Sequence, residues 1–256
     1  LARRGGDADA PGWLAGLPVA IKHLLPVAGV RSTQGSPIFA DHVPDRSDIV
    51  VETLERNGAV VLAKSNTPEF GAGANTFNPV FGKTRNPWNT SLTCGGSSGG
   101  SAVALATGEV WLASGSDLGG SLRIPASFCG VVGMRPSPGR VARGPSLNQN
   151  DDLAIEGPMA RNVADVALML DAMAGAAAED PMSLPLPARP FQDAVRNPVR
   201  PIRVAWSPDL GFLPVHPEVA AVAERAARRF EAMGIPVDLA TPDFSDAQEI
   251  FQTLRA

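Results

Sequence analysis

The sequence has few of the residues that build disulfide frameworks or metal sites. It contains two cysteines, Cys94 and Cys129, and three scattered histidines among 256 residues. Two cysteines cannot form the framework of a disulfide-rich secreted domain, and the histidines lack the spacing typical of metal ligands. We therefore expect both cysteines to be reduced and buried, and we expect neither a metal nor an organic cofactor.

Long apolar runs and blocks of basic residues are also missing. No apolar stretch approaches the roughly 18 residues of a membrane span, because Lys22-His23 and Thr107-Gly108-Glu109 interrupt the two best candidates. The net charge is −4, and no basic block is interleaved with aromatic residues as in a nucleic-acid surface. Arg3-Arg4 precedes the polar residues 7–11, where a twin-arginine export signal needs an apolar segment. We expect a cytoplasmic protein with no membrane and no nucleic-acid partner.

The composition that remains, 44% hydrophobic and 19% charged, is typical of a globular protein with a buried core. Residues 17–21 and 59–63 predict buried strands. Residues 48–57 place apolar side chains on one helical face and predict a helix between those strands. The alternation of strand, helix and strand favours an α/β protein over a helical bundle.

Further elements follow along the chain. Asn162 is a good N-cap for a helix that ends before Gly175. Turn-forming residues occur almost throughout residues 65–96, which predicts a long loop that walls a pocket. Residues 181–201 include six prolines and predict an extended surface segment. Strands are also predicted at 110–113, 131–134, 202–206 and 235–239, and helices at 122–130, at 217–233 and from 246.

Two stretches rich in glycine and serine, residues 95–101 and 115–121, are the main chemical signal. Such stretches are often flexible linkers, but the segment between them is too apolar for a linker. Glycine pairs let successive backbone N–H groups converge on one point. A serine hydroxyl beside those N–H groups suits acyl transfer, which needs a nucleophile and donors for the oxyanion.

The residues alone leave two catalytic arrangements open. In the first, Gly95-x-Ser97-x-Gly99 is the nucleophile elbow of an α/β-hydrolase esterase with a Ser-His-Asp triad, and His216 follows downstream. An elbow needs a preceding strand, whereas residues 86–93 contain proline and asparagine, and His216 stands where a helix N-cap would. In the second, Ser121 is the nucleophile at a helix N-terminus and Lys22 is the base. Lys22 ends a buried strand, and a lysine there either extends to the surface or is held in a site.

Most of residues 17–175 resemble the amidase-signature family. The matching motifs are P-V-A-I-K at 18–22, K-S-N-T-P-E-F-G at 64–71, G-G-S-S-G-G-S at 95–101, S-D-L-G-G-S-L-R-I-P at 116–125, F-C-G-V-V-G at 128–133, P-G-R-V at 138–141 and G-P-M-A-R at 157–161. The resemblance implies an α/β fold in which helices cover both faces of a mixed sheet. Because family members extend beyond both ends of this sequence, we expect an incomplete portion of that fold.

We expect one amidase-signature domain over residues 1–256. Its parts are a lead-in at 1–16, the catalytic core at 17–175, the proline-rich surface segment at 181–201 and further strands and helices at 202–256.

The resemblance implies a catalytic triad that hydrolyses a carboxylic amide through an acyl-enzyme. Ser121 is the implied nucleophile, Ser97 the serine in a cis peptide bond that relays the proton, and Lys22 the base. The implied partner is a small-molecule amide, and the apolar content of residues 65–90 favours aryl or medium-chain aliphatic amides. A homodimer is compatible with the resemblance. The oxyanion hole is implied to be the backbone N–H groups of Leu118, Gly119, Gly120 and Ser121, and the supporting residues are Ser98, Asp117 and Arg123.

Within the family, the alternative is the glutaminase A subunit of a tRNA-dependent amidotransferase, which acts in a multi-subunit complex. That protein usually carries a tyrosine in P-T-Y-G-R-V, where this sequence has P-S-P-G-R-V at 136–141. Residues 151–158 are also more similar to stand-alone bacterial amidases. We therefore expect a stand-alone amidase. A non-enzymatic scaffold on the same fold is disfavoured because Lys22, Ser97 and Ser121 are all retained.

Overall fold

The computed structural model describes residues 10–145 and 153–255. They form two compact units, one up to residue 197 and one from residue 198. The single domain expected over the whole chain stays a prediction. The first part of the expected lead-in lies outside the described residues, as do residues 151 and 152 of the segment compared with stand-alone amidases. Leu14, in the described part of the lead-in, is fully buried in the core of the first unit.

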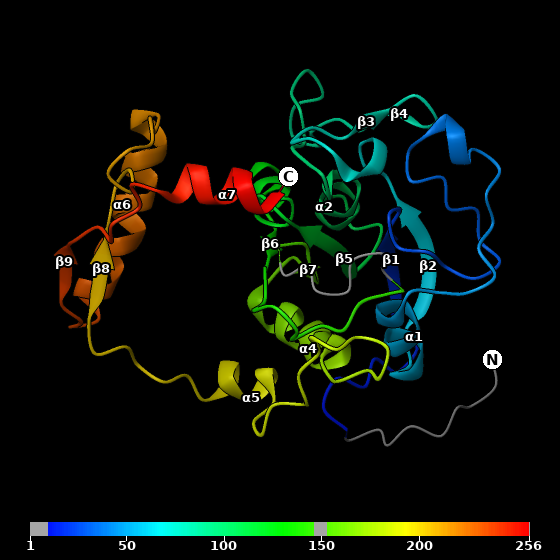
Figure 1. Ribbon diagram of the computed structural model, residues 1–256. Helices are drawn as coiled ribbons and strands as arrows, with labels where there is room; N and C mark the ends of the chain where they lie inside the picture. The colour runs from blue at the N-terminus through cyan, green and yellow to red at the C-terminus, as the bar shows by residue number, and fades with distance from the viewer. Residues whose placement is uncertain (1–9, 146–152, 256) are drawn as a thin grey trace. The chain divides into compact units, whose positions relative to one another are not determined.

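A mixed β-sheet forms the centre of the first unit (Figure 1). Its five strands are β1 (Pro18–Lys22), β2 (Val60–Ser65), β5 (Leu112–Asp117), β6 (Val132–Gly133) and β7 (Ile155–Ala160), in the order β2-β1-β5-β7-β6. β1 is parallel to both β2 and β5, whereas β7 is antiparallel to β5 and to β6. The predicted α/β class with a mixed sheet is confirmed.

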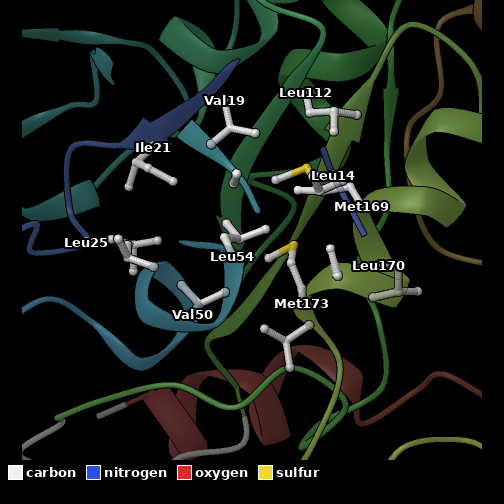
Figure 2. Packing of buried hydrophobic residues seen from close by; sticks show 14 of the residues in the cluster. Leu14, Val19, Ile21, Leu25, Val50, Leu54, Leu112, Met169, Leu170 and Met173 are labelled. Atoms are coloured by element: carbon white, nitrogen blue, oxygen red, sulfur yellow. The ribbon is translucent and has the colours of Figure 1, made fainter. Parts of the chain in front are cut away.

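Helices cover both faces of this sheet (Figure 1), as predicted. On one face, α1 (Ile49–Arg56) and α4 (Val163–Met173) pack on Val19, Ile21 and Leu112 in a cluster of buried side chains (Figure 2). On the other face, α2 (Gly99–Ala106) and α3 (Arg123–Cys129) pack on residues of three strands. These residues are Ala20 of β1, Ala113 of β5 and Met159 of β7. The two clusters separate because successive side chains of a strand point to opposite faces.

Local capping explains the helices that the sequence predicted. Asp48 precedes α1 and accepts a hydrogen bond from the Val50 N–H at 2.9 Å. Asn162 precedes α4 and accepts one from the Asp165 N–H at 2.9 Å. Gly130 ends α3 with φ of 70°, a conformation that glycine adopts without a side-chain penalty. These predictions are confirmed to within one or two residues.

Several strand predictions need correction. β2 was expected to be buried but is an edge strand, with Val60 38% and Leu62 57% exposed. β5 begins two residues later than expected and continues into the second glycine-serine stretch, as far as Asp117. β7 was not predicted, because its G-P-M sequence lacks the usual strand formers.

Two segments expected to lack regular structure contain short elements. Residues 65–96 include the 3₁₀ helix η2 (Glu69–Gly71) and a hairpin of β3 (Phe77–Asn78) with β4 (Gly82–Lys83). Another 3₁₀ helix, η1 (Pro37–Phe39), precedes α1. α5 (Phe191–Arg196) lies in the proline-rich segment, where the Asp171 carboxylate accepts hydrogen bonds from its first two N–H groups at 2.7 and 2.9 Å. α5 depends on Asp171, a partner about 20 positions earlier in the chain, which explains why the local pattern missed this helix.

The second unit contains two parallel strands and two helices. β8 (Val204–Trp206) pairs with β9 (Val237–Leu239), and α6 (Pro217–Ala232) connects them. α7 (Ala247–Arg255) follows. His216 caps α6, since its Nδ1 accepts a hydrogen bond from the Glu218 N–H at 3.3 Å. The strands and helices predicted here are confirmed with shorter bounds.

Two findings bear on partners and cofactors. Within residues 10–145 and 153–255, none of the helices combines the length and apolar character that crossing a membrane requires. The same part of the chain holds no group of three His, Cys, Asp or Glu side chains that could bind a metal ion. Cys94 and Cys129 are both unpaired and buried, as predicted.

Candidate active site

Lys22 lies at the carboxyl end of β1 and is completely buried. Strand alternation places it on the face of Ala20, the face that α2 covers. Its amine nitrogen is 2.6 Å from Ser97 Oγ and 2.7 Å from Ser116 Oγ. Its backbone N–H donates to Ser114 Oγ at 2.9 Å. Of the two alternatives left open by the sequence, the structure supports a lysine held in a site.

The surroundings of Lys22 favour its neutral form. Burial lowers the pKa of Lys22 from 10.5, because a charged amine loses its hydration inside the protein. The carboxylates of Glu156 and Asp117 act in the opposite direction, and the net pKa is about 8. A lysine with a lowered pKa can accept a proton near neutral pH, as a general base must.

Ser97 stands in the loop immediately before α2 and is 2% exposed. The Gly96–Ser97 peptide bond is cis, as the resemblance implies. Residues 84–98, all of which the structure describes, contain an isolated bridge between Arg85 and Thr93 but no strand. A nucleophile elbow requires a strand directly before the serine. The α/β-hydrolase arrangement around Ser97 is therefore wrong, and its proposed histidine is a helix cap.

Close packing explains the glycines at the start of α2. A Cβ atom added at Gly100 would lie 2.3 Å from the backbone nitrogen of Asn66, a distance that real atoms do not adopt. The Gly100 N–H instead donates to the Asn66 carbonyl at 3.2 Å. Glycine here lets the first turn of α2 approach the end of β2 and brings the preceding Ser97 to Lys22.

Ser121 is half-buried and lies two residues before α3. Its carbonyl accepts a hydrogen bond from the Ser98 N–H at 3.2 Å, which places the two glycine-serine stretches side by side. Ser98 is also joined to Ser116: its hydroxyl accepts from the Ser116 N–H at 3.2 Å and donates to the Ser116 carbonyl at 3.3 Å. Among the described residues, no hydrogen bond joins the hydroxyls of Ser97 and Ser121. Ser121 therefore joins the site through its backbone.

The Asp117 carboxylate organises the loop between β5 and α3. Its two oxygens accept hydrogen bonds from the N–H groups of Gly120 and Leu122 at 2.7 and 3.1 Å. The Arg123 guanidinium donates to both oxygens at 3.0 Å, and Arg135 donates to the Asp117 carbonyl. Burial alone would raise the pKa of Asp117, but the hydrogen bonds from Arg123, Gly120 and Leu122 lower it. These contacts fit the bracing role that the resemblance implies for Asp117 and Arg123.

One of the four expected oxyanion donors needs reassignment. The Gly120 N–H points at Asp117 Oδ1, so this donor already has a protein acceptor. Within the described residues, no hydrogen bond uses the backbone N–H of Leu118, Gly119 or Ser121. These three N–H groups remain as donors for a ligand oxygen.

The sequence interpretation missed two residues near Lys22. Ser116 contacts the amine, and Glu156 lies directly opposite Ser116 on β7. Glu156 is 8% exposed, and its Oε2 is buried without a hydrogen-bond partner. Burial raises the pKa of Glu156, and the nearby Asp48 carboxylate raises it further. The available signal was a single glutamate inside the otherwise uncharged run A-I-E-G-P-M-A at 154–160.

Comparison with known proteins finds matches to amidases and to amidotransferase A subunits. Residues 2–254 match the family model for Amidase. The chain is 41% identical over 249 residues to an acylamidase from Rhodococcus erythropolis, covering 97% of this chain and 52% of that protein. It is 43% identical over 233 residues to the A subunit of a glutamyl-tRNA(Gln) amidotransferase from Moorella thermoacetica, covering 91% and 47% respectively.

A solved bacterial aryl acylamidase of the amidase signature enzymes superposes with a TM-score of 0.83 at 33% identity. The match covers 90% of this chain and 48% of that one. The chain thus spans about half the length of the curated relatives it matches.

Proposed function

Because this chain belongs to the amidase family of amidase-signature enzymes, we propose that it hydrolyses a carboxylic amide to an acid and an amine through an acyl-enzyme on Ser121. One observation carries the proposal: the fully buried Lys22 amine lies 2.6 Å from Ser97 Oγ. A buried amine in contact with a hydroxyl is the arrangement that can withdraw a proton from a serine without a histidine.

In the first half of the reaction, neutral Lys22 takes the proton of the Ser97 hydroxyl while Ser97 takes that of Ser121. Ser121 Oγ then forms a bond to the amide carbon, and the carbonyl electron pair moves onto oxygen. The N–H groups of Leu118, Gly119 and Ser121 donate to this oxyanion. When the intermediate collapses, the C–N bond breaks and the leaving amine takes the proton that Lys22 returns through Ser97.

The second half repeats these steps with water in place of Ser121. Water gives its proton to the Ser97–Lys22 pair and attacks the ester carbon, and the ester bond to Ser121 then breaks. Ser121 recovers its proton and the acid leaves, which restores the resting state. The steps use no redox chemistry and consume one water for each amide.

Two features support these roles. The lowered pKa of Lys22 provides an amine that is substantially neutral near pH 8. The hydrogen bonds of Asp117 fix the loop that carries the nucleophile before a substrate binds, so less reorganisation is needed during the reaction.

The test is trapping of the nucleophile in the purified chain. A serine-directed fluorophosphonate should add one adduct, measured by intact mass and located on Ser121 by peptide mapping. Ser121→Ala should abolish both the adduct and amide turnover, whereas the exposed Ser91→Ala should change neither. Turnover that survives in Ser121→Ala would overturn the proposal.

The exposed residues of the loop after β2 indicate a substrate class. The exposed apolar residues of the segment after β2, among them Phe70, Phe77 and Trp88, favour aryl or medium-chain aliphatic amides. A panel of anilides, aliphatic amides and glutamine, read by the mass of the trapped acyl group, identifies the acid component. Homodimer formation and a cytoplasmic location stay predictions.

The similarity to amidotransferase A subunits supports a second candidate, release of ammonia from glutamine within a complex. Glutamine hydrolysis that appears only when partner subunits are added would favour it. Anilide or aliphatic amide hydrolysis by the chain alone would favour the stand-alone amidase.

A further inference from the structure

A cavity of about 490 Å³ lies at the carboxyl ends of β1 and β2. Its basic lining residues are His23, Arg31, Lys64 and Lys83, and its apolar ones are Val30 and Phe81. Neither Lys22 nor the serines of the proposed triad line it. Its volume is within the range of small-molecule sites.

The cavity gathers cations without a carboxylate among its lining residues. The side chains of Arg31 and Lys83 form no hydrogen bond and no ion pair with any other described residue. Lys64 donates to Ser32 Oγ at 2.9 Å and to the Leu25 carbonyl, both of them neutral acceptors. Burial lowers the pKa of Lys64 to about 8 against the charge of Asp48, which raises it, so the amine is still mostly charged at pH 7. Asp48 lies outside the lining. In a chain whose net charge is −4, this is a local concentration of positive charge.

The effect of these cations is visible on His23. The Thr33 N–H donates to His23 Nε2 at 2.9 Å, so the neutral ring carries its proton on Nδ1. Burial, together with the charges of Lys64 and Arg31, lowers the pKa of His23 to about 4. His23 is therefore a neutral member of the lining, and none of the lining residues carries a carboxylate.

The apolar residues of the lining favour an anion with a hydrocarbon part over an inorganic anion. The Arg31 guanidinium lies 5.3 Å from the centre of the Phe81 ring, and the His23 ring meets Phe81 edge-on at 5.0 Å. Val30 and Phe81 are 41% and 42% exposed. An inorganic anion would leave these surfaces in water, whereas a ligand with a hydrocarbon body would cover them.

We propose that this cavity binds a small organic acid, with its carboxylate between Arg31, Lys64 and Lys83 and its hydrocarbon part against Phe81 and Val30. Arg31 can hold a carboxylate through two parallel hydrogen bonds while its guanidinium stays stacked on Phe81. The site is separate from the proposed triad, so the proposal does not depend on amide hydrolysis.

The experiment titrates the purified chain with hexanoate, and separately with inorganic phosphate at the same ionic strength, by isothermal calorimetry. Imidazole resonances of His23 are followed by NMR, and only His42 and His216 need to be distinguished from it. We expect hexanoate to bind at one site, to shift the His23 signals and to bind more tightly than phosphate.

Variants locate the site. Arg31→Gln and Lys83→Gln should each weaken hexanoate binding, by about tenfold for the loss of a charge-assisted hydrogen bond. Arg56→Gln removes the same charge from an exposed position of α1 and should leave hexanoate binding unchanged. Chain labelled on the catalytic serine by the fluorophosphonate should still bind hexanoate.

Three results would overturn the proposal: no hexanoate binding, equal weakening by Arg31→Gln and Arg56→Gln, or loss of binding after serine labelling. The second would indicate diffuse electrostatic attraction, and the third would place the acid in the catalytic centre.

Discussion

The two faces of the central sheet are built from different residues. On the face covered by α1 and α4, three of the seventeen clustered residues are alanine, and the others are Val, Ile, Leu or Met. On the face covered by α2 and α3, six of the ten are Ala or Cys, so helices can approach the strands more closely there. The proposed chemistry belongs to the face with small residues.

The difference shows how the serine loops reach the lysine. At Gly115 in β5, an added Cβ would lie 2.5 Å from Leu122 and 2.9 Å from Ser98 Oγ. Because glycine has no side chain at this position, the loops before α2 and α3 can lie directly on the strand ends. The other face supplies apolar burial, which stabilises the fold in proportion to the area removed from water. One face thus positions the reacting groups and the other stabilises the unit.

The largest effect should follow from Lys22→Met, which removes the base and keeps the side-chain volume. We expect amide turnover to fall by on the order of 10³-fold or more, as when a member of a catalytic triad is lost. Thermal stability should be kept, because a buried amine is replaced by an apolar chain. Steady-state kinetics and thermal melts measure both, with Arg56→Met on the exposed side of α1 as control. Near-normal turnover in Lys22→Met would contradict the assignment of the base.

Leu170→Ala tests the stabilising face. Leu170 is 1% exposed within α4, so its truncation should cost about 2–5 kcal/mol of unfolding free energy. Turnover per folded molecule should stay unchanged, since the residue lies on the face away from Lys22. Denaturant unfolding gives the first quantity and active-site titration the second. Val163→Ala in the same helix, at a residue 58% exposed, should cost much less.

Gly100→Ala tests the face with small residues. The added methyl group meets the Asn66 backbone and should destabilise the chain by about 1–3 kcal/mol. It should also lower turnover, because the start of α2 must move away from β2 and carries Ser97 with it. The control is Gly108→Ala, where φ is +79° but the space is open. That variant should lose stability and keep its turnover, and equal turnover in the two variants would contradict the packing argument.

The smallest effect concerns pH. With the pKa of Lys22 lowered to about 8, turnover should rise with pH and level off above pH 8 as the amine loses its proton. The Glu156 carboxylate raises the pKa of Lys22, so Glu156→Gln should move the rise to lower pH. Rate profiles of the wild-type chain, Glu156→Gln and the control Glu55→Gln measure the shift. An unchanged midpoint in Glu156→Gln would exclude an electrostatic effect of this residue on the base.

The sequence predicted what depends on local contacts. The α1 and α4 boundaries follow from Asp48 and Asn162, whose side chains cap the helix that begins at the next residue. The buried faces of those helices follow from their apolar periodicity. α2 was missed because it begins with Gly99-Gly100, a pair that usually marks a turn and here is required by close packing.

The candidate site was harder to predict than the helices, because its residues are far apart in the sequence. The contact between Lys22 and Ser97 joins residues 75 positions apart, and the resemblance to a family, not any local pattern, indicated it. Glu156 was missed for a related reason: its meaning depends on which residue of β5 lies across from it. Pairing between distant strands is decided by the whole sheet, so a single segment does not encode it.

The antiparallel ladder between β5 and β7 therefore sets more than the shape of the sheet. Sliding β7 by one position along β5 would bring Ile155 or Gly157 opposite Ser116 and turn the glutamate to the other side. The proton affinity of an amine on β1 would then change although no residue in contact with it had been substituted. The register of β7 on β5, which pairs residues 40 positions apart, thus helps to determine the acidity of the lysine.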